Sequence, residues 1–388
     1  MKTNNKSIIY VNFAPYENAG KILDFILSHF HHVVVFAFNF HRLSKTQAPS
    51  TLTVFHNGKI ILEKRLFQTP TPASLAFILL PIRSLTIFLQ ILWHTWNLKL
   101  LYGPFDIYFT VNAFTAWSGN ILRSLGFVKK TIFWIWDYYP PIHENSVVMF
   151  MRRIYWRFDT IATQQTDHIV FLNRHLKTLR QKLCLLPKYC KNPIVEIGTN
   201  PVSYTRKINR PKHIQIVFLG VIKKIQGLDI FFQSAQLLAE LYPDLTLHVI
   251  GGGPDYEYFR EKANQSPLKV VFHGYINNEN IVDTIIRKCH VGIAPYVPDK
   301  SNCMYFSDPS KIKRYINFGL PVITTNVFDF SKDIKKMKAG IIIPYDSKAF
   351  VKAIYKIISN YPLYQAHAIA LSKRYRYTVL YKKIFTVQ

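Results

Sequence analysis

The residues best suited to chemistry in this chain surround residues 305–323, whose sequence is YFSDPSKIKRYINFGLPVI. Asp308 and Ser310 are residue types that cap helix N-termini, and Pro309 suits the first helical position. A helix that begins there presents free backbone N–H groups and the positive end of its dipole, which together favour an anion. Lys311, in the first turn, adds a full positive charge. An ordinary capped helix without a ligand is the alternative interpretation.

Turns that follow the strands expected in the second half of the chain carry further residues that suit phosphate. In a doubly wound sheet, ligands bind beyond the carboxyl ends of the strands. Small residues there let the backbone approach a ligand, and lysines neutralise its charge. Glycines at strand ends are commonly only turn formers, so the signal lies in their recurrence. The residues are Gly220, Lys223, Lys224, Gly251, Gly252, Gly253, His273 and Gly274, and a further turn at Tyr296 and Pro298 leads to residues 305–323.

The elements that would position these residues alternate along the whole chain. Strand-like and amphipathic segments follow one another, which predicts parallel sheets wrapped by helices. Because the pattern restarts after the polar stretch 199–212, we expect two Rossmann-like, doubly wound α/β domains facing a cleft. Expected helices include residues 20–30 and 116–125, and Gly319 should end the helix that opens near Ser310. The expected strands are 7–12, 32–38, 107–111, 131–136 and 168–171, then 214–219, 245–250, 269–272, 291–294, 321–324 and 340–343.

Composition narrows the class of protein. The 388 residues suffice for two domains with full cores, and a hydrophobic content of 49% rules out disorder. Lys and Arg exceed Asp and Glu by 49 to 22, a formal net charge of +27, which favours nucleic acid, phosphorylated small molecules or an acidic membrane surface as partners. No metal-ligand spacing and no D-x-D pair occurs, so we expect reduced thiols and no metal site. The cysteines are Cys184, Cys190, Cys289 and Cys303.

Residues 73–93 form an apolar stretch that Pro81, Arg83 and Gln90 interrupt. A membrane-spanning helix needs about 20 mostly uncharged apolar residues, so we do not expect this segment to span. A helix lying on a membrane surface, with flanking cations outward, and a plain buried helix are the two alternatives. The polar start of the chain shows no secretory signal. On the surface interpretation, the apolar face consists of Phe77, Ile78, Leu85, Phe88, Leu89 and Trp93.

The order and spacing of these pieces resemble the nucleotide-sugar domain of family-4-type glycosyltransferases, enzymes of the GT-B fold. The resemblance covers roughly residues 214–346, and the tail KRYRYTVLYKKIF resembles the family's closing helix, which crosses back to the first domain. The N-terminal half matches more loosely, through NFAPYENAGKILDFIL and IFWIWDYYPP. The matching pieces are IVFLGVIKKIQGLDIFFQSAQLL, LHVIGGGPDYEYF, VVFHGYI, CHVGIAPY, SDPSKIKRYINFGLPVIT and AGIIIPYD.

The resemblance implies three parts of the chain: residues 1–200 as an acceptor-side domain, 201–365 as a nucleotide-sugar domain, and 366–388 as the closing helix. It implies transfer of a hexose-type sugar from a nucleotide diphosphate sugar, with retention of configuration and without metal or other cofactor. Basic side chains and a helix N-terminus would stabilise the leaving diphosphate. The donor would meet the strand-end residues given above together with Asp308, Ser310 and Arg314, and Lys223 and Lys311 would act in catalysis.

Departures from the family pattern fall in this donor site. The family's acidic residue that accepts hydrogen bonds from the ribose is replaced by Arg314, which can only donate, and the earlier acid falls near Phe306. Asp308 is the nearest carboxylate. Arg314 lies three residues from Lys311, so we expect both on one strongly basic face. If the site is adapted, Arg314 should contact the donor or hold Asp308 in place; the alternative is a decayed site.

Candidates in the first half lie where two expected strands end. Glu17, Asn18, Gly20 and Lys21 occupy the first strand-to-helix connection, where this fold lets the acceptor approach, and Lys21 could hold an acceptor phosphate. A simple turn with Asn18 capping the helix is the alternative. Asn112, after residues 107–111, is a further acceptor candidate.

Asp137 follows the aromatic strand 131–136 and precedes YYPP. A carboxylate there could orient the acceptor hydroxyl or take up its proton, and a simple cap before a Pro-rich turn is the alternative.

These observations favour a glycosyltransferase at the cytoplasmic face of a membrane, acting on a saccharide or lipid-linked acceptor in envelope or polysaccharide assembly. Its expected partners are a nucleotide sugar, that acceptor and an anionic membrane surface. A non-catalytic sugar-nucleotide or glycan binder is the alternative that the lost acids favour. Net charge is the only argument for nucleic-acid binding, since no recognised nucleic-acid-binding motif occurs in the sequence. An epimerase with the same fold is a further alternative.

Overall fold

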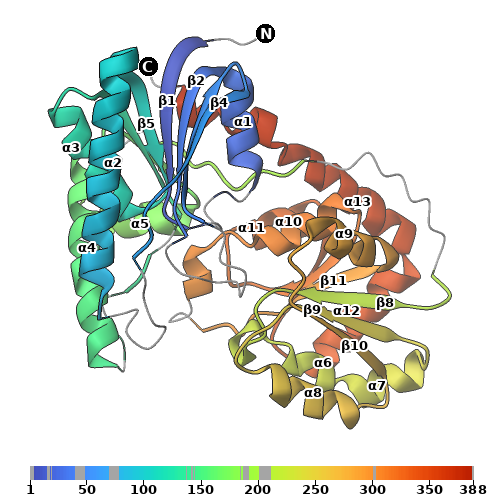
Figure 1. Ribbon diagram of the computed structural model, residues 1–388. Coiled ribbons are helices and arrows are strands. Elements are labelled where there is room, and N and C mark those ends of the chain that lie inside the picture. The colour runs from blue at the N-terminus through green and yellow to red at the C-terminus, as the bar shows by residue number, and fades with distance from the viewer. Residues whose placement is uncertain are drawn as a thin grey trace. The chain divides into compact units, whose positions relative to one another are not determined.

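The computed structural model describes residues 4–14, 18, 20–39, 49–69, 78–136, 138–140, 143, 145–183, 185–186, 192–200, 211–299 and 303–386. The chain divides into two compact units (Figure 1). The first comprises residues 1–196 and 377–388, and the second comprises residues 197–376. Each unit is built on its own sheet, so the two series of strands expected from the sequence form two separate α/β folds.

The sheet of the first unit has seven strands in the order β4-β3-β2-β1-β5-β6-β7. Its five parallel strands are buried runs rich in β-branched and aromatic residues, which is why the sequence predicted them. The central strand pairs with β2 through Ile8 and Val33, and with β5 through Ile8 and Ile107. The parallel strands are β1 (Asn4–Asn12), β2 (Phe30–Ala37), β5 (Phe105–Thr110), β6 (Val128–Ile135) and β7 (His168–Phe171).

An antiparallel hairpin at the edge of this sheet corrects the expectation of parallel strands alone. It consists of β3 (Thr51–His56) and β4 (Lys59–Arg65), and β3 pairs with β2. Asn57 and Gly58 form its turn, with φ angles of 54° and 78°. An Asn-Gly pair between apolar runs is a strong hairpin signal, because this two-residue turn needs positive φ at both positions. Because Asn57-Gly58 can be read in the sequence, this hairpin could have been predicted, although the strands expected from the sequence do not include it.

The helices of the first unit cover both faces of its sheet. Figure 1 shows α2, α3 and α4 gathered on one side of this unit. On that side, Ile87 and Ile91 of α2 and Leu122 of α3 pack with sheet residues such as Val34 and Val54 in one buried cluster. The helices are α1 (Ile22–His29), α2 (Leu80–Tyr102), α3 (Ala113–Ser124), α4 (Ser146–Gln165) and α5 (Arg174–Lys182).

Residues 377–388 belong to the first unit, whereas residues 366–376 of the expected closing helix belong to the second unit. The C-terminal segment of the first unit forms two short helices, α14 (Tyr377–Leu380) and α15 (Lys382–Phe385). The Tyr381 hydroxyl donates a hydrogen bond of 2.7 Å to the carbonyl of Gly20. The Phe385 ring lies 5.8 Å from that of Phe25 and 5.2 Å from that of Phe109. The preceding helix, α13 (Tyr361–Arg374), belongs to the second unit.

The sheet of the second unit has six strands in the order β10-β9-β8-β11-β12-β13, and every pairing is parallel. Counted from the first strand, this is the 3-2-1-4-5-6 order of the Rossmann fold, in which ligands bind where the order reverses, here between β8 and β11. The prediction of a doubly wound second domain is confirmed. The strands are β8 (Gln215–Leu219), β9 (Thr246–Ile250), β10 (Lys269–Gly274), β11 (Val291–Ala294), β12 (Val322–Thr325) and β13 (Gly340–Ile343).

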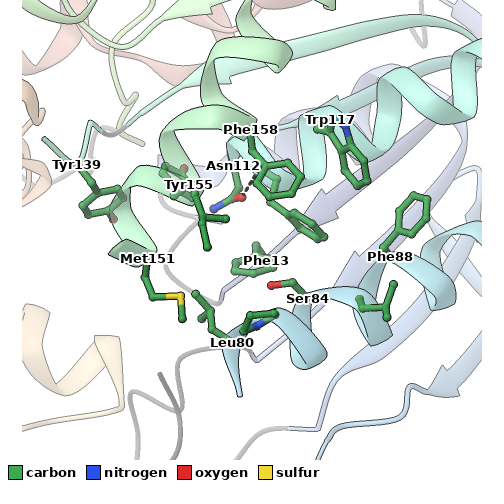
Figure 2. Close-up of a pocket in the computed structure, with 14 residues that line it drawn as sticks. Phe13, Leu80, Ser84, Phe88, Asn112, Trp117, Tyr139, Met151, Tyr155 and Phe158 are labelled. Atoms are coloured by element: carbon green, nitrogen blue, oxygen red, sulfur yellow. Dashed lines mark hydrogen bonds between the residues drawn. The ribbon is translucent and has the colours of Figure 1, made fainter. Parts of the chain in front are cut away.

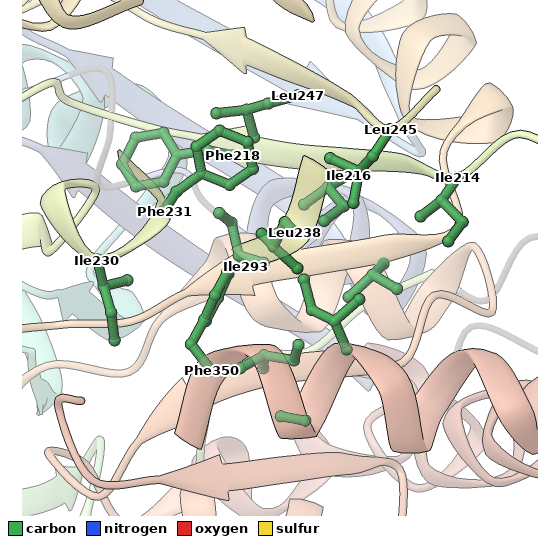
Figure 3. Close-up of a cluster of buried hydrophobic side chains, with 14 of the residues drawn as sticks. Ile214, Ile216, Phe218, Ile230, Phe231, Leu238, Leu245, Leu247, Ile293 and Phe350 are labelled. Carbon is green, nitrogen blue, oxygen red and sulfur yellow. The ribbon is translucent and has the colours of Figure 1, made fainter. Parts of the chain in front are cut away.

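Helices on both faces of this sheet complete the core. Figure 3 shows the cluster on one face, where Phe218 and Ile293 of the sheet meet Phe231, Leu238 and Phe350 from surrounding helices. The helices are α6 (Asp229–Gln233), α7 (Ala235–Leu241), α8 (Tyr256–Asn264), α9 (Glu279–Lys288), α10 (Ser310–Asn317), α11 (Phe330–Lys336), α12 (Ser347–Ser359) and α13.

The apolar segment around residue 83 forms the start of α2, and its exposure distinguishes the two alternatives in part. Arg83 is buried, whereas Leu85 and Trp93 are 55% and 64% exposed. The plain buried helix is therefore excluded: one face packs on the sheet and the other is apolar and exposed. Of the expected apolar face, Phe77 lies outside the described residues. Within the described ranges, no helix combines the length and apolarity needed to cross a membrane.

Candidate active site

The turns after β8 and β9 touch at the carboxyl edge of the second sheet. Gly220 and Gly251 have φ angles of 136° and 142°, which side-chain-bearing residues rarely adopt. A Cβ on Gly251 would lie 1.9 Å from the Gly220 carbonyl oxygen. The Ile222 N–H donates to the Gly252 carbonyl at 2.9 Å, and a Cβ on Gly253 would lie 2.3 Å from the Ile222 carbonyl oxygen. The glycines thus allow two turns to pack closely, and the structure brings these predicted residues together.

The turn after β10 joins them through its backbone. The Gly251 N–H donates to the Gly274 carbonyl at 2.8 Å. The His273 ring lies against that of His248, with Nε2 and Nδ1 3.0 Å apart. Burial lowers the pKa of His273, and burial followed by repulsion from His273 lowers the pKa of His248 to about 4. The histidine pair is therefore neutral at pH 7, and His273 adds no cation to this edge.

Lys311 places an ammonium group beside the first of these turns. Its Nζ donates to Gln226 Oε1 at 2.8 Å and lies 4.8 Å from the centre of the Phe218 ring and 4.9 Å from that of Tyr296. A Cβ on Gly220 would lie 2.9 Å from this nitrogen. No carboxylate in the described part of the chain forms an ion pair with it, and burial lowers the pKa of Lys311 to about 7. The geometry is that of a cation held where an anion would stabilise its charge.

The helix that carries Lys311 begins as expected at Ser310, but Asp308 does not cap it. Pro309 occupies the N-cap position, and no side chain among the described residues caps the helix. Asp308 accepts the Ile197 N–H at 2.8 Å and pairs with Lys313, which also donates to the Ile197 carbonyl at 2.9 Å. Lys313 is fully buried, so it needs the carboxylate as its counter-charge. The exposed start of α10 therefore keeps its backbone N–H groups without a side-chain cap.

Arg314 points to a neighbouring helix, which contradicts two expectations about it. Its Nε donates to Asp283 Oδ1 at 2.8 Å, and its Nη2 donates to the Glu279 carbonyl at 3.0 Å, both on α9. The prediction that Arg314 holds Asp308 in place is wrong, because Lys313 does so. The expected strongly basic face shared with Lys311 is wrong as well, since Asp283 balances the charge of Arg314.

Tyr315 fixes α10 against the sheet, a role that the sequence analysis missed. Its hydroxyl accepts the Leu219 N–H at 2.7 Å, at the end of β8. Its ring lies over Gly292 of β11, where a Cβ would be 2.3 Å from the ring. Burial raises the pKa of Tyr315 well above its usual value, so the hydroxyl stays neutral. The pairing of a tyrosine with a strand glycine is the signal that could have identified this contact.

The two lysines of the turn after β8 differ in their surroundings. The Lys224 N–H donates to Asp255 Oδ2 at 2.8 Å, and its ammonium lies 4.0 Å from the centre of the Tyr258 ring. Lys223 is exposed, and no described residue pairs with its ammonium. Of these two lysines predicted to suit phosphate, Lys223 is thus the one whose ammonium has no described partner.

Among the candidates in the first unit, Glu17 and Asp137 lie outside the described residues. Asn18 Oδ1 accepts the Leu23 N–H at 3.2 Å, so this residue caps the start of α1. Gly20 and Lys21 have φ angles of 69° and 64°. A left-handed conformation is strained for lysine, and such strain concentrates at functional sites. Lys21 Nζ lies 3.6 Å from an Asp24 carboxylate oxygen.

Asn112 caps α3 by accepting the Phe114 N–H at 2.9 Å, and it also lines a cavity of about 370 Å³. Figure 2 shows aromatic side chains from several elements around this cavity, among them Phe13, which follows β1, and Trp117 on α3. The cavity was not predicted, because its walls come from segments far apart in the sequence.

Part of the chain matches a described protein family. Residues 213–360 match the family model described as glycosyl transferases group 1. A protein from Haemophilus influenzae described as an uncharacterized glycosyltransferase is 24% identical over 207 residues, 53% of this chain and 55% of that protein. The match thus spans about half the length of that relative.

Solved structures resemble the whole chain. Sucrose-phosphate synthase from Thermosynechococcus elongatus has a TM-score of 0.70 at 14% identity, covering 98% of this chain and 97% of its own. Anabaena HepE in complex with UDP has a TM-score of 0.65 at 13% identity and 98% coverage of both chains. WaaG, a glycosyltransferase involved in lipopolysaccharide biosynthesis, has a TM-score of 0.61 at 16% identity and 97% coverage of both.

At these identities the structural likeness shows the fold, so the chain has the GT-B fold with two α/β domains. Together with the match over residues 213–360, it supports a relationship to the glycosyltransferase group 1 family.

Proposed function

We propose that this protein is a glycosyltransferase that moves a hexose-type sugar from a nucleotide diphosphate sugar to a saccharide or lipid-linked acceptor. The observation that carries the proposal is the ammonium of Lys311, which pairs with no carboxylate among the described residues and lies beside the glycine turns at the carboxyl edge of a Rossmann sheet. This is where doubly wound sheets bind ligands. The match of residues 213–360 to group 1 glycosyl transferases supports the same assignment.

The proposed chemistry depends on charge that develops as the bond to the sugar breaks. The leaving diphosphate gains negative charge, and fixed donors aimed at that charge are usually the largest catalytic contribution. Three groups of the second unit can supply it: the N–H groups at the start of α10, Lys311, and the available ammonium of Lys223. Gly220 and Gly251 let the backbone come close to the ligand. We propose retention of configuration and no metal, as in the family that the sequence resembles.

The acceptor side of the proposal rests on the first unit. Asn18, Gly20, Lys21 and Asn112 follow strands β1 and β5 at their carboxyl ends. In the sequence, Glu17 belongs to the connection after β1, and Asp137 belongs to the connection after β6. We propose that they meet the acceptor, with Asp137 orienting its hydroxyl. The net charge of +27 and the exposed apolar face of α2 support peripheral attachment to the inner face of a membrane.

A non-catalytic nucleotide-sugar binder is the second candidate, and Arg314 favours it. The residue stands where the family has a ribose acceptor, but an arginine has no acceptor atom, and the guanidinium of Arg314 is already paired with Asp283. The two candidates differ in turnover. An enzyme transfers or hydrolyses a nucleotide sugar that it binds, whereas a binder leaves it intact.

A thermal-shift panel of UDP-, GDP-, ADP- and dTDP-sugars tests binding, because a specific ligand raises the unfolding midpoint by mass action. Lys311→Ala should then weaken nucleotide diphosphate binding by about 1.5–3 kcal/mol, the worth of a charge-assisted hydrogen bond. Lys269→Ala, an exposed lysine at the start of β10, is the matched control and should bind normally. Unchanged affinity in a folded Lys311→Ala protein would contradict the proposal.

Turnover is measured with the nucleotide sugar that binds, as release of nucleoside diphosphate with and without acceptor lipids. EDTA should leave the rate unchanged. A strict requirement for manganese or magnesium would contradict the metal-free mechanism, and binding without any turnover would favour the second candidate.

A further inference from the structure

We propose that the cavity of the first unit holds one hydrocarbon chain of a bilayer lipid, namely the lipid part of the acceptor. The term acceptor rests on the proposed function, whereas the chain-binding cavity is argued from the structure itself. The cavity lies among α2, α3 and α4 and has a volume of about 370 Å³ (Figure 2).

The walls of the cavity suit a hydrocarbon chain and little else. They consist almost wholly of aromatic and aliphatic side chains, with few polar groups such as Ser84 and Asn112. A water molecule and a methylene group each take up roughly 30 Å³ in a liquid, so the cavity has room for on the order of a dozen chain carbons. A peptide would bring backbone N–H and C=O groups into a space with few partners for them, which is unfavourable.

The cavity is continuous with an exposed apolar face of α2. Leu85 lines the cavity and is nevertheless 55% exposed, so it stands at the opening. From there, exposed apolar side chains recur at helical spacing, and such a contiguous face on a folded protein marks an interaction surface. We call this face the α2 stripe. It consists of Ile82, Leu85, Leu89, Trp93, Trp96 and Leu100.

The charges around the stripe and the cavity favour a lipid surface as the source of the chain. The sequence of α2 contains no Asp or Glu. On α4, which lines the cavity through Ile154 and other residues, Arg153 and Arg157 are exposed. The single acid of α4, Asp159, is buried and paired with Arg180. Exposed cations on a helix that lines the cavity, together with the absence of acids from α2, favour an anionic lipid surface as the source of the chain.

The position of the cavity points to the acceptor rather than to a structural lipid. Phe13 and Asn112, which follow β1 and β5, belong to its wall. These are the carboxyl ends of adjacent parallel strands, where open α/β sheets bind their ligands. A chain in the cavity would therefore hold its head group beside the acceptor candidates of this unit.

Filling the cavity tests the proposal. The probe is 11-(dansylamino)undecanoic acid, and its binding is followed by the anisotropy of the directly excited dansyl group. Ser84→Trp places a large side chain in the cavity and should weaken probe binding by roughly tenfold or more, because fewer methylenes are buried. Leu101→Trp adds the same side chain to the same helix, outside both the cavity and the α2 stripe, and should bind the probe within about twofold of the wild type. Ile154→Trp fills the cavity from α4 and replaces Ser84→Trp if that variant does not fold.

Competition with linear alkanols adds a second measurement. Affinity should rise about fourfold with each added methylene until the cavity is full, at roughly a dozen carbons. No probe binding by the wild-type protein, or equal binding by the filled variants, would overturn the cavity proposal even if nucleotide sugars bind. If the probe binds in the cavity but Ser84→Trp uses a lipid-linked acceptor as well as the wild type does, the assignment to the acceptor is overturned.

Discussion

Lys311 gives the second unit a characteristic dependence of stability on pH. Its ammonium loses water on folding and gains no carboxylate partner from the residues that the structure describes, so burial lowers its pKa from 10.5 in the unfolded chain to about 7. Between these values the unfolded chain binds one more proton, and the free energy of unfolding therefore rises with pH across the window. Lys311→Met removes this cost and should stabilise the unit by about 1–3 kcal/mol at pH 6, with little gain near pH 10. Urea unfolding at both pH values measures the difference.

The control for this substitution is Lys269→Met, which removes an exposed lysine at the start of β10. It should shift stability equally at the two pH values. If Lys311→Met behaves in the same way, the ammonium is already neutral or well solvated at pH 6, and burial does not hold its charge at a cost.

We expect the protein to take up a proton at the Lys311 side chain when it binds a nucleotide diphosphate. An anion beside Lys311 favours the charged ammonium and raises its pKa again. At pH 8, above the pKa of about 7, binding should therefore take up close to one proton. Titration calorimetry in two buffers of different ionisation enthalpy counts the protons. Lys311→Met should show none, and wild-type binding without proton uptake would place the diphosphate elsewhere.

Arg314 makes a separable prediction, because the structure gives it a partner. Arg314→Glu sets a carboxylate against Asp283 and should destabilise the second unit by about 1 kcal/mol, as expected for a partly exposed pair. The double change Arg314→Glu with Asp283→Arg restores opposite charges and should recover most of that loss. Denaturant unfolding of the four proteins forms a double-mutant cycle. A coupling energy of zero would show that the pair contributes nothing.

At the scale of elements, the sequence predicted what local patterns determine. The buried β-branched runs marked the parallel strands, and Gly319, with its φ of 73°, ends α10 as expected. The prediction was wrong where a residue distant in sequence is involved. Asp308 accepts a hydrogen bond from the Ile197 N–H and pairs with Lys313 instead of capping the helix. The same holds for Arg314, since nothing near it in sequence points to Asp283.

The exposed face of α2 predicts peripheral membrane binding with two separable components. The cations of the protein should attract anionic vesicles, and salt should weaken that attraction by screening. The α2 stripe should add an apolar contribution that salt leaves intact. Leu89→Ser with Trp93→Ser, which lie on the stripe but outside the cavity wall, should reduce vesicle binding at both low and high salt. Vesicle co-sedimentation measures it.

The matched control lies on an exposed face of another helix of the same unit. Leu183, at the end of α5, is also an exposed apolar residue, and Leu183→Ser should leave vesicle binding unchanged. Equal loss in this control would mean that surface hydrophobicity in general, and no particular helix face, determines binding.

At the scale of the whole molecule, more of the two-unit α/β organisation than of the sites could be predicted from the sequence. The donor-side turns could be predicted because each lies directly after a strand, and topology alone brings them to one edge. The cavity could not be predicted, because its wall combines Phe13 with side chains of α2 and α4, and these segments meet only through tertiary packing. The closing segment was predicted from its resemblance to a family, whereas its aromatic contacts appear only in the fold.

That closing segment carries the last prediction. Tyr381 is fully buried in the first unit, although the whole second unit separates it in sequence from its partners Phe25 and Trp134. Tyr381→Ala removes a buried ring and should destabilise the first unit by about 3–5 kcal/mol. Val379→Ala, two residues earlier and exposed, should cost less than about 0.5 kcal/mol. Hydrogen exchange separates the units: protection should fall in β1 and β5 and persist in β8 and β9. Equal loss of protection in both sheets would show that the two units unfold together and that the segment stabilises the whole chain.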